Sequence, residues 1–182
     1  VPTVRLTEIF RQKADSRIVR NAHMINRGEH PDFNENSGDF FRLRRMQGGS
    51  CVETIVELCK RRLPENMKIP SNQIQVLSPS RKGETGTANL NKCLQAALNP
   101  PDESKKEKIF GETVFRTGDR VIQIKNNYDI VWKDKLGKSG MGVYNGDIGT
   151  IVEIDTASEY LKVDHEDNVA LYGFEMLNEL EH

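Results

Sequence analysis

Residues 113–129 read TVFRTGDRVIQIKNNYD, and this stretch decides the fold of the carboxyl-terminal part of the chain. β-branched and aromatic residues form short runs in it, and Gly, Asp and Asn separate the runs. Comparable runs follow at a spacing of roughly ten residues, namely NGDIGTIVEID (145–155), YLKVDHED (160–167) and NVALYGFEML (168–177). Short strands with turns at this spacing are typical of a small antiparallel sheet.

The pattern predicts an antiparallel barrel of about five strands, of the kind that cold-shock, OB and SH3-like domains share. We place this barrel at residues 112–179. The segment WKDKLGKSGMG, 132–142, lacks periodicity, so we expect an exposed excursion between two strands. Trp132 is the only tryptophan of the chain. It either plugs the barrel or offers a platform for a base, and we favour the plug.

Residues 1–111 follow a different pattern, in which short strands alternate with helices. We expect a strand at 4–12 (VRLTEIFRQ) and a buried parallel strand at 74–80 (IQVLSPS), whose carboxyl end opens into the loop SPSRKGETG. The sequence also predicts three helices. The first begins at a cap formed by Asp15 or Ser16 and ends at Gly28, and the second begins at the capping box Ser50–Glu53 and ends before Pro64. The third begins at a cap formed by Thr85 or Thr87 and is closed by Pro100. Such alternation indicates α/β architecture.

Polar segments suggest where these parts begin and end. The stretch 29–39 (EHPDFNENSGD) reads as a loop and FFRLRR behind it as a short extended piece. The proline-led PPDESKKEK, 100–108, marks a boundary, so we divide the chain into 1–111 and 112–179. Residues 180–182 (LEH) read like the start of a purification tag, and we leave His182 out of the functional reasoning. Because the first residue is Val, we expect the chain to begin inside a longer gene product.

Composition restricts the class of protein. With 36% hydrophobic and 29% charged residues, the chain has enough apolar surface for a core and no apolar run long enough to span a bilayer. The three cysteines form no CxxC pair, which favours a reducing cytoplasm over a disulfide framework or a zinc site. Residues 1–111 carry 19 Lys and Arg against 13 Asp and Glu, whereas residues 112–182 carry 7 against 14. The first part therefore has the more basic surface, which suits phosphates.

Phe10, Arg11 and Gln12 stand together where the first predicted strand ends. At that place an arginine fork can bind a phosphate while the aromatic ring stacks on a base, an arrangement that suits a nucleotide. The alternative is that Phe10 belongs to the core and Arg11 pairs with a nearby carboxylate. The residues alone leave both interpretations open.

Several blocks together resemble the carboxyl-terminal half of RecD-like DNA helicases, the family that includes the alpha subunit of exodeoxyribonuclease V. The blocks extend over nearly the whole chain, in the order LTEIFRQ, SRIVRNAHMINRG, IQVLSPSRKGETGTANLNKCLQAALNPP, FRTGDRVIQIKNNYD and VYNGDIGTIVEID. Any one of them is weak, and their order and spacing make the resemblance specific.

The resemblance implies a superfamily 1 helicase, in which two RecA-like domains of the P-loop NTPase type hydrolyse ATP at their interface and move 5′ to 3′ along single-stranded DNA. This chain would supply part of the second RecA-like domain and an inserted SH3-like barrel. Arg11 would reach the γ-phosphate of ATP, with its Mg²⁺, bound mainly by the first RecA-like domain of the same protein, and Phe10 and Gln12 would lie at the nucleotide. The chain contains no GxxxxGK[ST] loop, so we expect no ATP hydrolysis and no bound cofactor without the rest of that protein.

Two segments are our candidates for contacts to DNA. The loop residues Ser78, Ser80, Arg81 and Lys82 follow the predicted parallel strand, where α/β sheets bind ligands. The barrel residues Lys125, Asn126, Asn127 and Tyr128 combine a cation, two amides and an aromatic ring, a mixture that binds single strands by charge and stacking. Alternatively, Arg81 and Lys82 form a solvated turn, and the two asparagines simply make a turn after a strand.

Two other functions stay open at this point. The barrel could be a nucleic-acid-binding module without a motor, or it could dock protein partners such as nuclease subunits. The second alternative draws on the acidic end of the chain, where residues 145–182 hold one lysine against ten acids. We predict no metal site and give His23 and His165 no catalytic role, because neither has Cys or carboxylate partners at the spacing of metal ligands.

Overall fold

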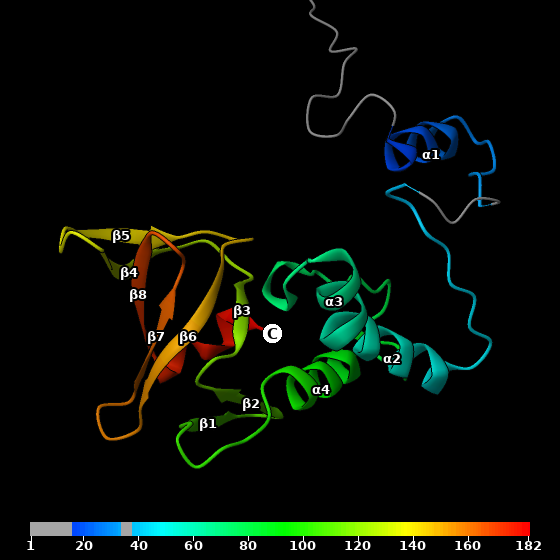
Figure 1. Cartoon of the computed structure of the whole chain (residues 1–182). Helices are drawn as coiled ribbons and strands as arrows, with labels where there is room; N and C mark the ends of the chain where they lie inside the picture. The colour runs from blue at the N-terminus through cyan, green and yellow to red at the C-terminus, as the bar shows by residue number, and fades with distance from the viewer. Residues whose placement is uncertain (1–15, 34–37) are drawn as a thin grey trace, which may run out of the picture. The chain divides into compact units, whose positions relative to one another are not determined.

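The computed structural model describes residues 16–33 and 38–182. The chain divides into two compact units, residues 1–46 and 47–182, which we treat separately (Figure 1). The predicted strand at 4–12 lies outside the described residues, and so do Phe10, Arg11 and Gln12. Our predictions for them therefore stay predictions.

The described part of the first unit is built around helix α1 (Arg17–Asn26). Ser16 caps it, since its hydroxyl accepts the N–H of Val19 at 3.3 Å, and Gly28 follows the helix with φ +76°. The predicted helix with Ser16 as its cap is confirmed. The buried Asn21 then ties the helix to the following loop by two hydrogen bonds with the backbone of Asp32, at 2.8 and 3.2 Å.

The second unit begins with a helical run that is longer than predicted. It comprises α2 (Gly48–Glu57), a π-helical turn η1 (Leu58–Arg62) and α3 (Leu63–Met67). The predicted capping box is wrong: Gln47 is the N-cap, and the hydroxyl of Ser50 donates to the carbonyl of Gln47 at 2.9 Å.

The predicted end before Pro64 is also wrong, because the helix runs through Pro64 to Met67. A proline inside a helix lacks an N–H and crowds the carbonyl four residues back. Here the wider π-turn lies directly before it, with the N–H of Leu63 bonded to the carbonyl of Leu58, and such turns relieve this conflict. The run ends at Lys68, which has a left-handed φ of 58°.

The predicted buried parallel strand at 74–80 does not form. The chain makes a short 3-10 turn, η2 (Ser71–Gln73), and then continues without strand pairing, and Leu77 is 87% exposed. A parallel strand needs hydrogen-bonded neighbours on its edges and cover on both faces. Every strand pair in the part of the chain that the structure describes is antiparallel, so these residues lack the neighbours that such a strand requires.

Helix α4 (Thr87–Leu98) confirms the third predicted helix, with a different cap. Neither Thr85 nor Thr87 caps it; Gly86 is the N-cap, and a Cβ there would lie 2.5 to 2.6 Å from backbone oxygens of Arg81 and Lys82. The N–H groups of Thr87 and Ala88 donate to the carbonyls of Ser80 and Arg81. The loop before α4 is thereby folded onto its first turn.

The rest of the second unit is antiparallel, as predicted, and curls into a half-barrel (Figure 1). A hairpin of β1 (Glu107–Phe110) and β2 (Thr113–Arg116) precedes a seven-stranded sheet in the order β5-β4-β8-β7-β6-β3-β9. Its strands are β3 (Arg120–Gln123), β4 (Asn127–Asp134), β5 (Ser139–Val143), β6 (Ile148–Asp155), β7 (Tyr160–Asp164), β8 (Asn168–Gly173) and β9 (Leu180–Glu181), with a 3-10 helix η3 (Phe174–Glu179) before the last. Our estimate of about five strands was low.

The segment 132–142 is not an exposed excursion. It contributes residues 132–134 to β4 and most of β5, with Val131 opposite Met141 and Trp132 opposite Gly140. The sequence hid this hairpin because glycines occupy positions of β5 where a side chain would normally reveal the alternation. A Cβ on Gly140 would lie 2.3 Å from the Trp132 ring. Glycine is therefore required where the indole covers the neighbouring strand.

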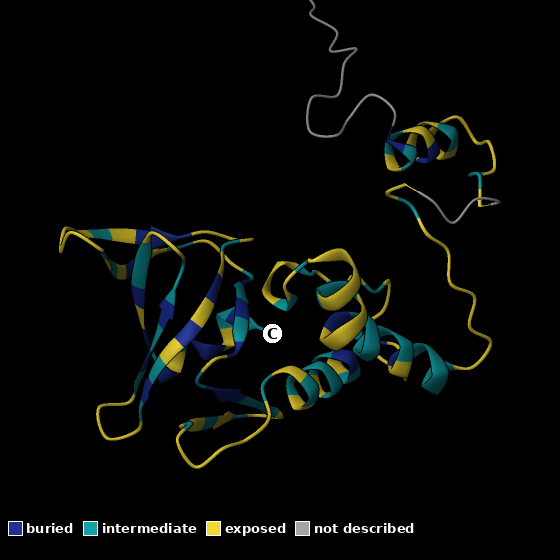
Figure 2. Cartoon of the chain, viewed as in Figure 1, coloured by how far each residue is buried: buried dark blue, intermediate teal, exposed yellow. Residues whose placement is uncertain are grey.

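The core lies inside the curled sheet, where buried residues of successive strands pack together. Figure 2 colours the buried residues of these strands dark blue. Phe115, Ile151, Leu161 and Tyr172 are each at most 1% exposed. Trp132 packs against this core and donates its indole N–H to the carbonyl of Gly142 at 3.1 Å. This packing agrees with the plug rather than with a base platform.

Asp119 joins α4 to the sheet. Its carboxylate is 3% exposed and accepts hydrogen bonds from the amides of Gln95 (2.6 Å) and Asn99 (2.7 Å) and from the N–H of Arg116 (2.6 Å). The Nε2 of His182 lies 3.0 Å from the same carboxylate. Burial alone raises the pKa of Asp119, but the hydrogen bonds from His182 and Asn99 and the nearby His182 charge outweigh burial and hold this pKa below its ordinary value.

Residues 180–182, which we had set apart, pack into this unit. Leu180 and Glu181 pair with β3, and the His182 ring lies 5.3 Å from that of Phe115. The predicted boundary at Gly111 falls in the turn of the β1–β2 hairpin, because Phe110 pairs with Thr113. The division into 1–111 and 112–179 otherwise stays a prediction.

Replacing Asp119 by Asn should destabilise the chain by roughly 1 to 3 kcal/mol, since buried donors lose a charged acceptor. The folded-state pKa of Asp119 lies below the ordinary 3.8. The ionised carboxylate therefore makes its full contribution to the free energy of unfolding at pH values above 3.8, and this contribution is lost as the pH falls through the lowered pKa. Urea unfolding from neutral to acid pH measures both effects, with Asp167→Asn in an exposed turn as the control. Equal midpoints for wild type and Asp119→Asn at neutral pH would contradict this role.

Gly140→Ala should displace the Trp132 indole, because the added Cβ cannot occupy the same space as the ring. We expect red-shifted tryptophan emission and a loss of roughly 1 to 3 kcal/mol in stability. Gly49→Ala in α2 is the control, since a Cβ there meets only the end of the flexible Glu84 side chain. Unchanged emission would show that the indole does not lie across Gly140.

Candidate nucleic-acid interface

The loop before α4 turns its two predicted hydroxyls inward. Ser78 donates to the carbonyl of Thr85 at 2.8 Å, and Ser80 donates to the carbonyl of Lys82 at 2.8 Å. The N–H of Ser80 also donates to the Ser78 hydroxyl at 3.3 Å. Both hydroxyls therefore stabilise the shape of the loop.

The two cations of this loop remain at the surface. Arg81 and Lys82 are exposed, and the Arg81 guanidinium lies 3.2 Å from the carboxylate of Glu181. Arg81 also lines a groove of about 610 Å³ between α4 and the β1–β2 hairpin, together with Lys92 and Glu112. This surface carries both signs of charge, so the loop alone is a weak anion site.

The second candidate segment, Lys125 to Tyr128, comprises the end of the connection between β3 and β4 and the first two residues of β4. Lys125 and Tyr128 are exposed, and Tyr128 shows 64% of its surface. The two asparagines are structural: Asn126 accepts the N–H of Asn145 at 2.9 Å, and Asn127 donates to the carboxylate of Glu179 at 2.9 Å. A cation and a ring are thus presented on an anchored connection, while the amides hold that connection in place.

A buried polar chain supports this anchoring. Glu179 also accepts a hydrogen bond from the amide of Gln123, which is fully buried and accepts the hydroxyl of Tyr172 at 3.2 Å. Burial raises the pKa of Tyr172 well above its ordinary value, so its hydroxyl stays protonated and can donate. His165 is the last member of this row of hydrogen-bonded side chains, and its Nε2 lies 3.3 Å from the Tyr172 hydroxyl. These bonds fix the end of β3 from which Lys125 follows.

The two candidate segments share one support. Arg81 meets Glu181, and Asn127 meets Glu179, which lies two residues earlier. The stretch from η3 to β9 therefore contacts both the loop before α4 and the start of β4. The sequence could not show this link, because the four residues come from distant parts of the chain.

Sequence reasoning missed Tyr144, which is 49% exposed. Its ring centroid lies 5.9 Å from that of Tyr128, with an angle of 76° between the planes. The NGD turn that follows Tyr144 is the signal that could have located it, since this turn starts a strand beside β3. The site therefore contains two exposed rings where the sequence indicated one.

We also searched the described residues for metal sites and for membrane-spanning helices. Across residues 16–33 and 38–182, no group of three or more His, Cys, Asp or Glu side chains is placed to hold a metal ion. Within the same residues, no helix combines the length and the apolar character needed to cross a membrane.

Comparisons with known proteins agree with this description. Residues 90–165 match the family model of the SH3 domain of ATP-dependent RecD-like DNA helicases. Over 178 residues the chain is 31% identical to the ATP-dependent RecD2 DNA helicase of Deinococcus radiodurans, and the alignment covers 97% of this chain. It spans only 21% of that relative's length. The resemblance to RecD-like helicases that the motifs indicated is confirmed.

Proposed function

Since residues 90–165 are an SH3 domain of the RecD-like helicase family, we propose that this chain is part of an ATP-dependent DNA helicase. The observation that carries this proposal is the similarity to a RecD2 helicase along 97% of the chain. The helicase would move 5′ to 3′ on single-stranded DNA and serve DNA repair or recombination. A cytoplasmic location and the second RecA-like domain in residues 1–111 belong to the same proposal.

The barrel would form part of the path of the single strand. Lys125 offers a charge for a phosphate and Tyr128 a ring for a base, and both are exposed on an anchored backbone. Such a pair binds single strands with little sequence preference, because every base has a face that can stack. Arg81 and Lys82 would add phosphate contacts from the loop before α4.

Arg11 would act at the nucleotide. Phosphoryl transfer depends mainly on positioning and on stabilising negative charge, and an arginine supplied across an interface contributes ~10³ to 10⁵ in rate. We propose that Arg11 contacts the γ-phosphate of ATP and Mg²⁺ held mainly by the first RecA-like domain, with Phe10 and Gln12 beside the nucleotide. This assignment rests on the motif LTEIFRQ and its family resemblance.

A protein-docking function is the second candidate. Residues 145–182 carry ten acids and a single lysine, and a surface of this charge repels DNA and attracts basic partners. Membership of the exodeoxyribonuclease V alpha subunit branch, with nuclease subunits as those partners, rests on resemblance alone. A binding module without a motor would use the same barrel contacts as the helicase and would differ in the absence of ATP hydrolysis.

Arg11→Ala in the longer protein should lower DNA-stimulated ATP hydrolysis by ~10³ or more, while the affinity for single-stranded DNA stays close to that of the wild type. Steady-state phosphate release measures the first effect and fluorescence anisotropy the second. Arg20→Ala, on the exposed side of α1, is the matched control. Unchanged turnover in Arg11→Ala would remove this residue from the mechanism.

Labelled oligothymidylate should bind the chain at low salt, and the affinity should fall as salt rises. Lys125→Ala should reduce the slope of log K against log salt by about 0.7, the effect of one phosphate contact on a single strand. Lys162→Ala is the control, because this lysine is paired with Glu153 on the acidic part of the sheet. Absence of binding at low salt would favour protein docking instead.

A further inference from the structure

We propose that Tyr144 and Tyr128 together form a two-ring platform that stacks bases of single-stranded nucleic acid, with Lys125 holding the adjacent phosphate. The inference rests on the proposed function, and it adds Tyr144 and a defined geometry to it. Three observations support it: the exposure of the rings, the anchoring of their backbone, and a glycine that makes room for one ring.

The two rings are exposed, whereas the other aromatic side chains of the second unit are buried or partly buried. Phe115, Tyr172 and Phe174 are at most 9% exposed, whereas Tyr128 and Tyr144 show 64% and 49% of their surface. The pair meets edge to face, with centroids 5.9 Å apart. In this arrangement the face of at least one ring stays open, and an open ring face is what a base stacks on.

The backbone that carries Tyr144 is fixed at both ends of its turn. The N–H of Tyr144 donates to the carboxylate of Asp147 at 2.8 Å, and the N–H of Asp147 donates back to the carbonyl of Tyr144 at 2.9 Å. Asn145 is bonded to Asn126, and Gly146 donates to the carbonyl of Gln123 at 2.8 Å. The turn is thus attached to the same connection that carries Lys125 and Tyr128, so the platform loses little backbone freedom when it binds.

Gly142 makes room for the Tyr144 ring. Its φ of +98° is a conformation that favours glycine, and a Cβ at this position would lie 3.2 Å from the Tyr144 hydroxyl. The same Cβ would lie 3.9 Å from the Cα of Tyr128. Gly142 therefore lets Tyr144 extend across the strand toward Tyr128, which brings the two rings together.

Among the lysines of residues 125–144, Lys125 lies at the end of the β4–β5 hairpin that carries the rings, whereas the other three lie at the opposite end, near the hairpin turn. Residues 125–144 carry the four lysines Lys125, Lys133, Lys135 and Lys138 against two aspartates. All four lysines are exposed, and none forms a salt bridge with any residue that the structure describes. Asp134, one of the two aspartates, accepts the N–H groups of Leu136 and Lys138 in the hairpin turn.

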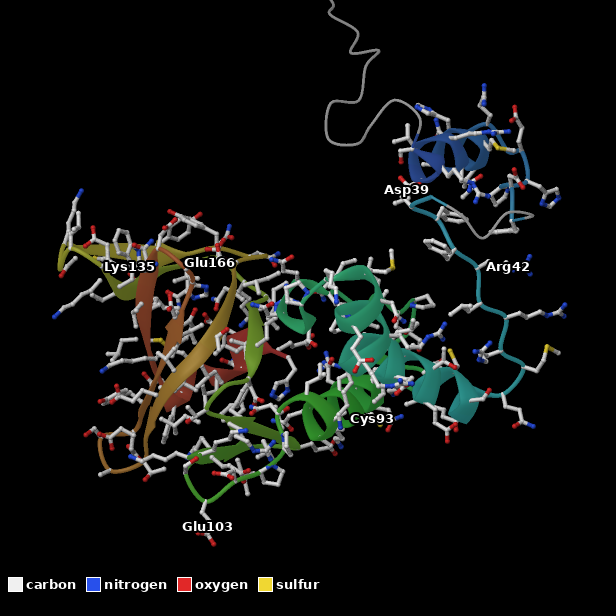
Figure 3. The ribbon with its side chains drawn as sticks, viewed as in Figure 1. Asp39, Arg42, Cys93, Glu103, Lys135 and Glu166 are labelled. Atoms are coloured by element: carbon white, nitrogen blue, oxygen red, sulfur yellow. The ribbon has the colours of Figure 1, made fainter. Side chains whose placement is uncertain are left out.

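Acidic residues also lie near the β4–β5 hairpin turn, because Asp134 pairs with Asn168, which directly follows Glu166 and Asp167. Figure 3 labels Lys135 in the β4–β5 hairpin and Glu166 in the turn between β7 and β8. Residues 145–182, which include that turn, hold ten acids and one lysine. The carboxylate of Asp147 accepts the N–H of Tyr144, so the immediate surroundings of the rings carry both signs of charge. A single strand combines a negative charge for Lys125 with flat faces for stacking.

Fluorescence anisotropy with labelled oligothymidylate tests the platform. Tyr144→Ala and Tyr144→Leu should each weaken binding by roughly 5- to 100-fold, the loss expected for one stacked base, and should leave the salt slope unchanged. Tyr144→Phe should bind like the wild type, because stacking needs the ring and not the hydroxyl. Tyr160→Ala, which removes a ring beside Glu153 on the acidic strands, should have no effect. Trp132 emission and urea midpoints confirm that each variant is folded.

The outcomes separate this inference from the proposed function. If Lys125→Ala loses affinity while Tyr144→Ala and Tyr144→Leu bind like the wild type, the platform is wrong and the DNA path through Lys125 stands. If the wild-type chain binds no oligonucleotide at low salt, the DNA path itself fails. Competition by poly-glutamate as strong as that by unlabelled oligothymidylate would show binding by charge alone and would overturn base stacking.

Discussion

The buried carboxylate of Asp119 is the constraint on which the rest of the second unit depends. It accepts hydrogen bonds from α4 through Gln95 and Asn99, from the end of β2 through the N–H of Arg116, and it faces His182 after β9. A buried charge with so many donors is costly to disturb, since each donor would lose its partner together with the acceptor. Helix and sheet therefore form one body through this group.

Carboxylates at the end of the chain carry this rigidity to the candidate interface. Glu179 holds Asn127 and Gln123, while Glu181 holds Arg81. In the proposed helicase, the start of β4 would keep its position relative to the η3–β9 stretch, and the exposed Arg81–Glu181 pair would add a weaker contact from the loop before α4. A track for a single strand needs contacts at fixed separation, and preorganised contacts cost less entropy on binding.

Local patterns predicted part of this structure and failed where partners lie far along the chain. The helix after Ser16 and the helix before Pro100 follow from caps, breakers and apolar spacing, and the antiparallel sheet follows from strand runs with regular turns. The parallel strand at 74–80 failed because a strand depends on neighbours, which local sequence does not supply. The β4–β5 hairpin was missed because Gly140 and Gly142 remove the alternation on which such predictions rely.

The candidate site likewise contains residues that the sequence predicted and one that only the structure revealed. Lys125 and Tyr128 were found because a cation and a ring lie close in sequence, whereas Tyr144 meets Tyr128 only through the pairing of β4 and β5. The most direct test of the barrel as a nucleic-acid path is photocrosslinking of an iodouracil-substituted single strand to the chain, followed by mass spectrometry of the joined peptides. Crosslinks at Tyr128 or Tyr144 are the predicted result. Crosslinks confined to the acidic strands β6 and β7, or none at all, would contradict it.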